Sequence, residues 1–179
     1  MTTVAMIGLG LLIIVFPFYS EELTGNTNAT GLMWASFAIG STAGAVLTAG
    51  LQQRIGPDLM VAGGMALMGF SVLLWPFAPN LWVALPLVGL TGLGDGPSLA
   101  ALFSVRQRDT PPPLLAQVFT TASSLKLAAF AVGSALAAPI IESWGVEGAV
   151  VVAAAMHLAP TAAWLVFWPR EEGPAQAEA

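Results

Sequence analysis

Two charged side chains, Asp95 and Lys126, lie inside long apolar stretches of the sequence. A charge at the centre of a membrane helix costs about 2.5 to 3.5 kcal/mol on insertion scales, and such residues mark ion or solute pathways. Each lies about eight residues from the end of its stretch, a depth of about 12 Å. Equal depth on consecutive helices permits an ion pair. We predict that both residues line a solute or proton pathway. The alternatives are a static pair, or one side chain that reaches to water.

Other residue types narrow the chemistry further. Asp95 lies in the run Gly92 to Pro97, and a span interrupted by Gly and Pro is a pointer to a binding site within the membrane. His157 precedes Pro160 in another apolar stretch, where it either relays protons or makes a polar packing contact. The chain has no Cys and one His, so we expect no metal and no cofactor. It has no nucleophile with a base and no phosphate-binding loop, so we expect no enzyme.

The composition sets the class of protein. Hydrophobic residues make up 56% of the chain and charged residues 8%, whereas soluble domains carry about 25% charged residues. The mean hydropathy of +0.81 agrees. The formal net charge of -5 argues against nucleic acid as a partner. The sequence therefore predicts an integral membrane protein, with the lipid bilayer as its surroundings.

Six apolar stretches are long enough, or nearly so, to cross a hydrocarbon core of about 30 Å. Their ranges are 4–18, 31–51, 59–78, 81–103, 118–141 and 148–168. Helices satisfy their own backbone hydrogen bonds in lipid, and the strand alternation of a barrel is absent. We predict an all-α membrane protein with a six-helix bundle over residues 1–170 and a disordered cytoplasmic tail over 171–179. The first stretch lacks a basic leader and a cleavage site, which favours a helix over a signal peptide.

The basic residues indicate how the chain is oriented. Arg54, Arg106, Arg108 and Arg170 follow the second, fourth and sixth stretches. The loops between the other stretches hold Glu21, Glu22, Glu142 and Glu147 without Lys or Arg. Basic loops face the cytoplasm. We therefore predict a multi-pass protein of the cell (inner) membrane with both termini in the cytoplasm.

An internal repeat divides the chain. Residues 35–45 align with 128–138 at an offset of 93, and six of the eleven positions are identical. The copies lie in the second and fifth stretches, so the six helices form two triplets of about 1–80 and 81–170. Three helices per repeat invert the second copy relative to the first. The alternative is convergence, because Ala, Gly and Ser are common in membrane helices.

The aligned segments carry matching stripes of small residues. Gly40 and Gly44 lie four positions apart in one copy, as do Gly133 and Ala137 in the other. Such pairs let helix backbones approach closely in lipid. We predict that these four residues form helix-packing faces.

The loop after the second stretch resembles a family signature. Residues 50–56 resemble a degenerate form of the loop Gly-x-x-x-Asp-Arg-x-Gly-Arg-Arg of the major facilitator superfamily, with Gly50, Arg54 and Gly56 matching. Gln53 stands at the acidic position, and Pro57-Asp58 replace the final basic pair. Residues 103–121 resemble the loop between helices ten and eleven of efflux-type members. The resemblance covers about residues 4–170 and maps onto the C-terminal six helices.

The resemblance implies a transporter of small solutes, driven by an ion gradient and most like an efflux protein. Full members have twelve helices in two halves, and the second and fifth helices of each half face the other half. The stripes at Gly40 and Gly133 are therefore expected near a partner surface, either a missing N-terminal half or a second copy. The first stretch begins almost at Met1, which places the missing half on the N-terminal side. The rival interpretation is a degenerate, non-transporting subunit or scaffold that packs against another membrane protein.

Overall fold

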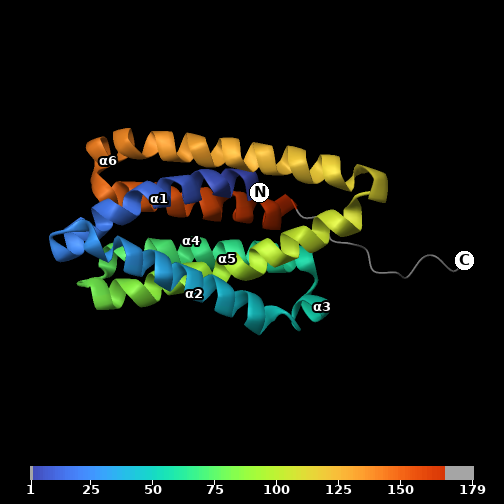
Figure 1. Ribbon diagram of the computed structural model, residues 1–179, viewed down its shortest axis with the longest axis horizontal. Helices are drawn as coiled ribbons and strands as arrows, with labels where there is room; N and C mark the ends of the chain where they lie inside the picture. Colours follow the sequence, from blue (N-terminus) through green and yellow to red (C-terminus); the bar gives the residue numbers. More distant parts are fainter. Residues whose placement is uncertain (1, 168–179) are drawn as a thin grey trace, which may run out of the picture.

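The structure, a computed structural model, describes residues 2–167, and within them every regular element is a helix. The all-helical prediction is confirmed for this part of the chain. The elements are α1 (Thr2–Thr24), η1 (Thr27–Ala29), α2 (Thr30–Thr48), α3 (Gln52–Ile55), α4 (Pro57–Leu73), η2 (Trp75–Phe77), α5 (Leu81–Asp109), η3 (Pro112–Leu114) and α6 (Leu115–Phe167) (Figure 1). The predicted tail and Arg170 lie outside the described residues.

Two helices extend beyond the apolar stretches that predicted them. α1 continues past Phe18 until Gly25, whose φ is 73°. α5 continues past Phe103 until Thr110, which is extended because a proline follows it. Hydropathy marks the part of a helix that lies in lipid, whereas the helix itself ends at a backbone breaker or cap. The predicted boundaries are therefore too short at these two ends.

The last helix, α6, contains both stretches predicted as separate spans, 118–141 and 148–168. Gly145 inside it has φ of 73° and ψ of 178°, so the backbone is not helical at that point. Figure 1 shows the chain reversing there, which leaves a first arm of residues 115–144 and a second arm of 146–167 running back along the molecule. α6 therefore holds the last two predicted helices as two arms that meet at this glycine, whose positive φ permits the turn.

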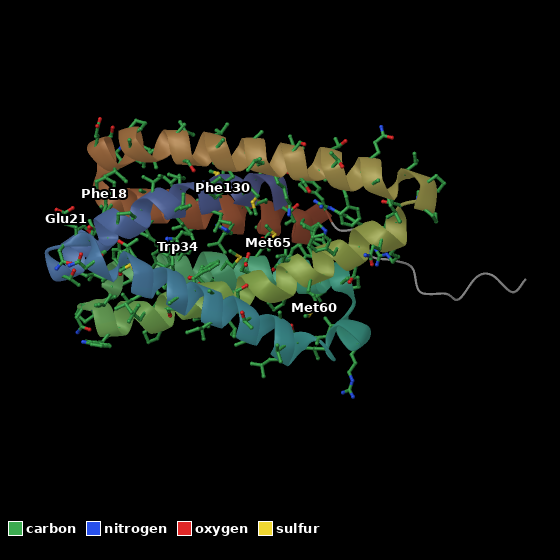
Figure 2. The ribbon with its side chains drawn as sticks, viewed as in Figure 1. Phe18, Glu21, Trp34, Met60, Met65 and Phe130 are labelled. Carbon is green, nitrogen blue, oxygen red and sulfur yellow. The ribbon has the colours of Figure 1, made fainter. Side chains whose placement is uncertain are left out.

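The connections gather at two ends of an elongated bundle (Figure 1). The first carries η1, η2 and Gly145, and we call it the Trp75 end. The second carries α3, η3 and the last turn of α5, and we call it the Arg108 end. Figure 2 shows Phe18 and Glu21 near the Trp75 end and Met60 toward the Arg108 end.

Four segments within the described residues are long and apolar enough to cross a membrane: Thr2–Thr24, Thr27–Thr48, Pro57–Phe77 and Pro112–Phe167. The last of these is double length, because it includes both arms of α6. α5 is long enough but less apolar than these segments, and it holds Asp95 and two prolines. The helices therefore form a multi-pass membrane bundle.

Helix pairing follows a simple pattern. α1 packs mainly on α6, α2 packs on α5, and α4 lies against both α5 and α6. The large buried cluster includes Phe16, Trp75 and Val88 and extends toward the Trp75 end. A smaller cluster around Met60, Met65 and Ala101 lies toward the Arg108 end. Ala5 and Met65 of the smaller cluster also border a cavity that Asp95 and Lys126 line.

Candidate functional site

Close helix contacts place Asp95 against α2. A Cβ atom added at Gly92 or at Gly96 would collide with a backbone carbonyl oxygen of α2, so only glycine permits this approach. The crossing brings the Asp95 carboxylate to Ser41, whose hydroxyl donates a hydrogen bond to Oδ2 over 3.1 Å. The glycines of α5, which is a continuous helix through this region, therefore allow the close crossing that positions its acidic side chain.

Asp95 opens into a small cavity between four helices. Its walls come from α1, α4, α5 and α6 and include Met6, Met65, Met68, Asp95, Lys126 and His157. Figure 2 shows Met65 in the middle of the bundle. The space for water is about 40 Å³. Because one water needs about 10 to 15 Å³ by this measure, the cavity has room for about three waters. This part of the site suits ions and water better than a large solute.

The two charges predicted to line a pathway border this same cavity, but they do not touch. Asp95 and Lys126 are both half-buried, and no ion pair joins them among the described residues. The prediction of equal depth is consistent with their shared cavity. A static ion pair, the alternative raised by the sequence, is not present. Each charge therefore stays available to an ion, a proton or a solute.

His157 forms a third polar part of the cavity wall. Its side chain is buried, and its Nδ1 lies 2.8 Å from the carbonyl oxygen of Ala153. A carbonyl oxygen only accepts, so Nδ1 carries the hydrogen and Nε2 carries the lone pair in the neutral ring. The sequence left a relay and a packing contact open for this residue. The backbone bond fixes the ring, and the cavity brings it near the charges.

The signature-loop residues lie at the Arg108 end. Gly50 precedes α3, Arg54 lies within it, and Gly56, with φ of 85°, joins it to α4. Arg54 is exposed and forms no ion pair within the described residues. Instead Asp58, in the first turn of α4, pairs with Arg108 of α5 over 3.0 Å. Asp58 therefore links this loop to α5, although in the comparison with the family signature it was only a mismatch to the final basic pair.

Arg108 also binds its neighbour in the chain. Its guanidinium donates to both carboxylate oxygens of Asp109, over 2.7 and 3.1 Å. That hydrogen bonding lowers the pKa of Asp109. Close by, Arg106 lies 5.6 Å from the ring centre of Phe119 at the start of α6. Sequence reasoning missed the contact of Arg106 with Phe119, because it depends on how the end of α5 meets the start of α6.

The four small residues predicted as packing faces are all buried. A Cβ added at Gly40 would collide with the carbonyl oxygen of Gly89 in α5, and one at Gly133 would collide with that of Ile7 in α1. Gly44 likewise lies against α5, and Ala137 is fully buried. Helices of the same chain thus cover these four residues, and their expected place near a partner surface stays a prediction.

These contacts occur twice, in matching positions. Gly92 lies against the Phe37 carbonyl, and Gly10 lies against the Phe130 carbonyl. Phe130 follows Phe37 by 93 residues, the offset of the repeat, and Gly92 follows Gly10 by 82 residues. The contacts of Gly40 with Gly89 and of Gly133 with Ile7 obey the same two offsets. The crossing of α2 with α5 thus corresponds to the crossing of the first arm with α1.

Comparison with known proteins gives the family. The model of the Major Facilitator Superfamily matches residues 1–179. The chain belongs to the major facilitator superfamily. A relative from Sinorhizobium fredii (strain NBRC 101917 / NGR234), described as the uncharacterized MFS-type transporter y4rN, is 29% identical over 137 residues. The match covers 74% of this chain and 33% of the relative, so it spans about a third of the relative's length. No solved structure matches.

Membership in the major facilitator superfamily gives the bundle a general role. It supports membrane transport, and it points to a transporter and not an enzyme. A multi-pass bundle of apolar helices agrees with that role.

Proposed function

We propose that this chain moves a small solute out of the cell through the inner membrane, driven by an ion gradient, as the C-terminal six-helix half of a major-facilitator transporter. The observation that carries the proposal is the cavity in which Asp95 and Lys126 lie without pairing. Charges without a salt bridge in a membrane bundle are costly, and they commonly mark an ion or solute pathway.

Comparison of the two repeats supports a functional role for both charges. At the offset of 82, Asp95 corresponds to Ile13. At the offset of 93, Lys126 corresponds to Met33, which is fully buried. Apolar residues thus fill the same two places in the other copy. Packing alone does not require charges there, so we infer that Asp95 and Lys126 are retained for transport.

The proposed topology has six membrane-crossing segments in two inverted triplets. The first triplet is α1, α2 and α4, and the second is α5 with the two arms of α6. The matching helix crossings support this division. α3, which contains Arg54, and the basic last turn of α5 share one end of the bundle (Figure 1). By the positive-inside rule that end faces the cytoplasm, and the proposed topology puts both termini on the cytoplasmic side of the membrane.

Transport by reconstituted protein tests the proposal. Proteoliposomes with the chain alone, or with the product of an adjacent upstream reading frame if that frame encodes six more spans, would be loaded with ethidium as a cationic probe. A pH gradient would then be imposed. We expect Asp95→Asn and Lys126→Met to reduce gradient-driven flux at least tenfold, because each removes a charge from the cavity. Glu21→Gln, an exposed acid at the Trp75 end, is the matched control.

The possible results separate the proposal from its rival. Flux and pH dependence that stay unchanged in both charge variants, with normal membrane insertion, would contradict a pathway at Asp95 and Lys126. Absence of flux from every preparation would favour the non-transporting subunit. One observation favours that second candidate: α2 exposes Ile39, Val46 and Leu47, each about 70% exposed or more. An apolar face of this kind suits lipid, a second copy or another membrane protein.

A further inference from the structure

Two serines at equivalent positions use different hydrogen-bond acceptors. Ser134 follows Ser41 by 93 residues, the offset of the repeat. The Ser134 hydroxyl donates to the backbone carbonyls of Gly10 and Phe130, over 3.0 and 3.1 Å. The Ser41 hydroxyl donates to the Asp95 carboxylate over 3.1 Å. At corresponding helix crossings, the equivalent serine hydroxyls therefore bond a carboxylate in one repeat and backbone carbonyls in the other.

The acceptors used by Ser134 have counterparts beside Ser41. Gly92 corresponds to Gly10, and Phe37 corresponds to Phe130. A Cβ added at Gly92 would meet both the Phe37 carbonyl and the backbone nitrogen of Ser41, so these groups lie together at the crossing. In lipid a hydroxyl needs an acceptor, and a backbone carbonyl of the preceding turn is a common one. Ser41 thus has an alternative bond to backbone close at hand.

We propose that Ser41 is a positioning residue for Asp95, with two hydrogen-bond states. Its hydroxyl donates to the ionised carboxylate, as in this structure. When Asp95 takes up a proton from cavity water, the hydroxyl moves to the carbonyls of Phe37 and Gly92, the arrangement that Ser134 displays. Proton uptake in α5 is thereby transmitted to α2. The inference rests on the proposed function, in which Asp95 lines the pathway.

The surroundings of Asp95 favour this assignment. Ser41 makes the one hydrogen bond to the carboxylate that is found within the described residues. The other titratable groups that border the cavity are Lys126 and His157, both from α6. α1 and α4 contribute only Thr, Ala, Leu and Met to its walls, and α2 has no titratable residue. Ser41 is therefore the contact through which α2 senses the charge on Asp95.

Infrared spectroscopy of the full reconstituted chain tests the two states directly. The carbonyl stretch of a protonated carboxyl group, assigned by its loss in Asp95→Asn, reports proton uptake. The chain has no cysteine, so Ser41→Cys adds a single S–H stretch that reports the acceptor of the thiol. We expect that band to shift with pH at the same midpoint as the carboxyl band. Ser134 donates to backbone carbonyls and not to a carboxylate, so the S–H band of Ser134→Cys should not shift with pH. A Ser41→Cys band that does not move, or moves equally in Ser134→Cys, would overturn the inference.

A second pair of variants measures the effect on Asp95 itself. Removing a donor from an ionised carboxylate disfavours the charged form, by an amount typical of charge-assisted bonds. Ser41→Ala should therefore raise the midpoint of the carboxyl band by about one pH unit. Ser134→Ala should leave it unchanged, and Ser41→Thr should restore it. An unchanged midpoint in Ser41→Ala would contradict the positioning role.

Failure of this inference and failure of the proposed function give different results. If the midpoint shifts as expected while Asp95→Asn leaves ethidium flux intact, the positioning role stands and the pathway proposal fails. If flux depends on Asp95 while neither infrared band responds to Ser41, the pathway stands and the positioning role fails. The spectroscopic readout needs no transported solute, which keeps the two tests independent.

Discussion

The Trp75 end and the Arg108 end of the bundle are held together by different kinds of contact. At the first, the ring of Trp75 stacks on Phe16 and Tyr19 at centroid distances of 5.4 and 5.7 Å, and the indole is fully buried. At the second, Arg108 pairs with Asp58 while the two side chains remain 52% and 27% exposed. One end relies on packed rings and the other on solvent-facing charges.

The difference indicates where the bundle opens most easily. Buried aromatic contacts come apart only at the cost of a large cavity, whereas exposed ion pairs contribute little and weaken with salt. The charged cavity lies between the two ends, and its walls include Thr2 and Leu102 on the side of the Arg108 end. We therefore expect the helices to separate at the Arg108 end while the Trp75 end stays closed. Substitutions at each end test this expectation.

The largest effect is expected at the indole of η2. Trp75→Ala would remove a fully buried ring that stacks on two aromatic neighbours, Phe16 and Tyr19, and we expect a loss of about 3 to 5 kcal/mol in the free energy of unfolding. Reversible unfolding in mixed detergent micelles measures it. Trp82→Ala is the matched control at the same end, because Trp82 is 77% exposed. Equal losses in the two variants would contradict the idea of a packed end.

A smaller effect is expected from the polar network beneath the rings. Thr91 accepts hydrogen bonds from the hydroxyl of Ser71 over 2.8 Å and from the Trp75 indole nitrogen over 3.2 Å. Thr91→Val keeps the shape but leaves both donors without this acceptor. Side-chain hydrogen bonds between membrane helices average about 0.6 kcal/mol and reach about 1.7, so we expect a loss within that range.

The control for this variant is Thr42→Val. Thr42 is exposed and its hydroxyl donates only to Ala38 in the same helix, so no contact between helices is lost. We expect its unfolding free energy to stay close to that of the unchanged protein. If Thr42→Val costs as much as Thr91→Val, the network between α4 and α5 has no special role at the Trp75 end.

Much of the fold was predictable from the sequence, because hydropathy reports which segments lie in lipid. The apolar stretches found every long helix. They did not predict that the last two helices extend until only Gly145 separates them. They also missed the short α3, a single turn in the loop before Gly56. Length and polarity alone do not set these features.

The candidate site was predictable only in part. Asp95 and Lys126 were visible because a charge in an apolar stretch is rare and costly. Ser41 was not, because a serine in a membrane helix commonly bonds its own backbone and gives no signal in the sequence. Only the pairing of α2 with α5 shows that its acceptor is the carboxylate. The same holds for Asp58 with Arg108, whose meeting depends on how two helix ends are arranged.

The smallest effect is expected at the exposed charges. Arg108→Gln removes the ion pairs with Asp58 and Asp109, and we expect a loss of stability below that of Thr91→Val, measurable at low salt and absent at high salt. Arg54→Gln, also exposed and without an ion pair in the described part of the chain, is the control.

The loss of stability in Arg108→Gln should depend on pH in a predictable direction. The hydrogen bond from Arg108 lowers the pKa of Asp109, so this pair contributes stability above the ordinary Asp pKa of about 3.9 and loses it as pH falls through the lowered value. The difference between Arg108→Gln and the unchanged protein should therefore shrink in acid. A stability difference that grows in acid would contradict this sign. A loss of stability in Arg108→Gln that exceeds the loss in Trp75→Ala would mean that the Arg108 end holds the bundle closed. The comparison between the two ends would then have to be reversed.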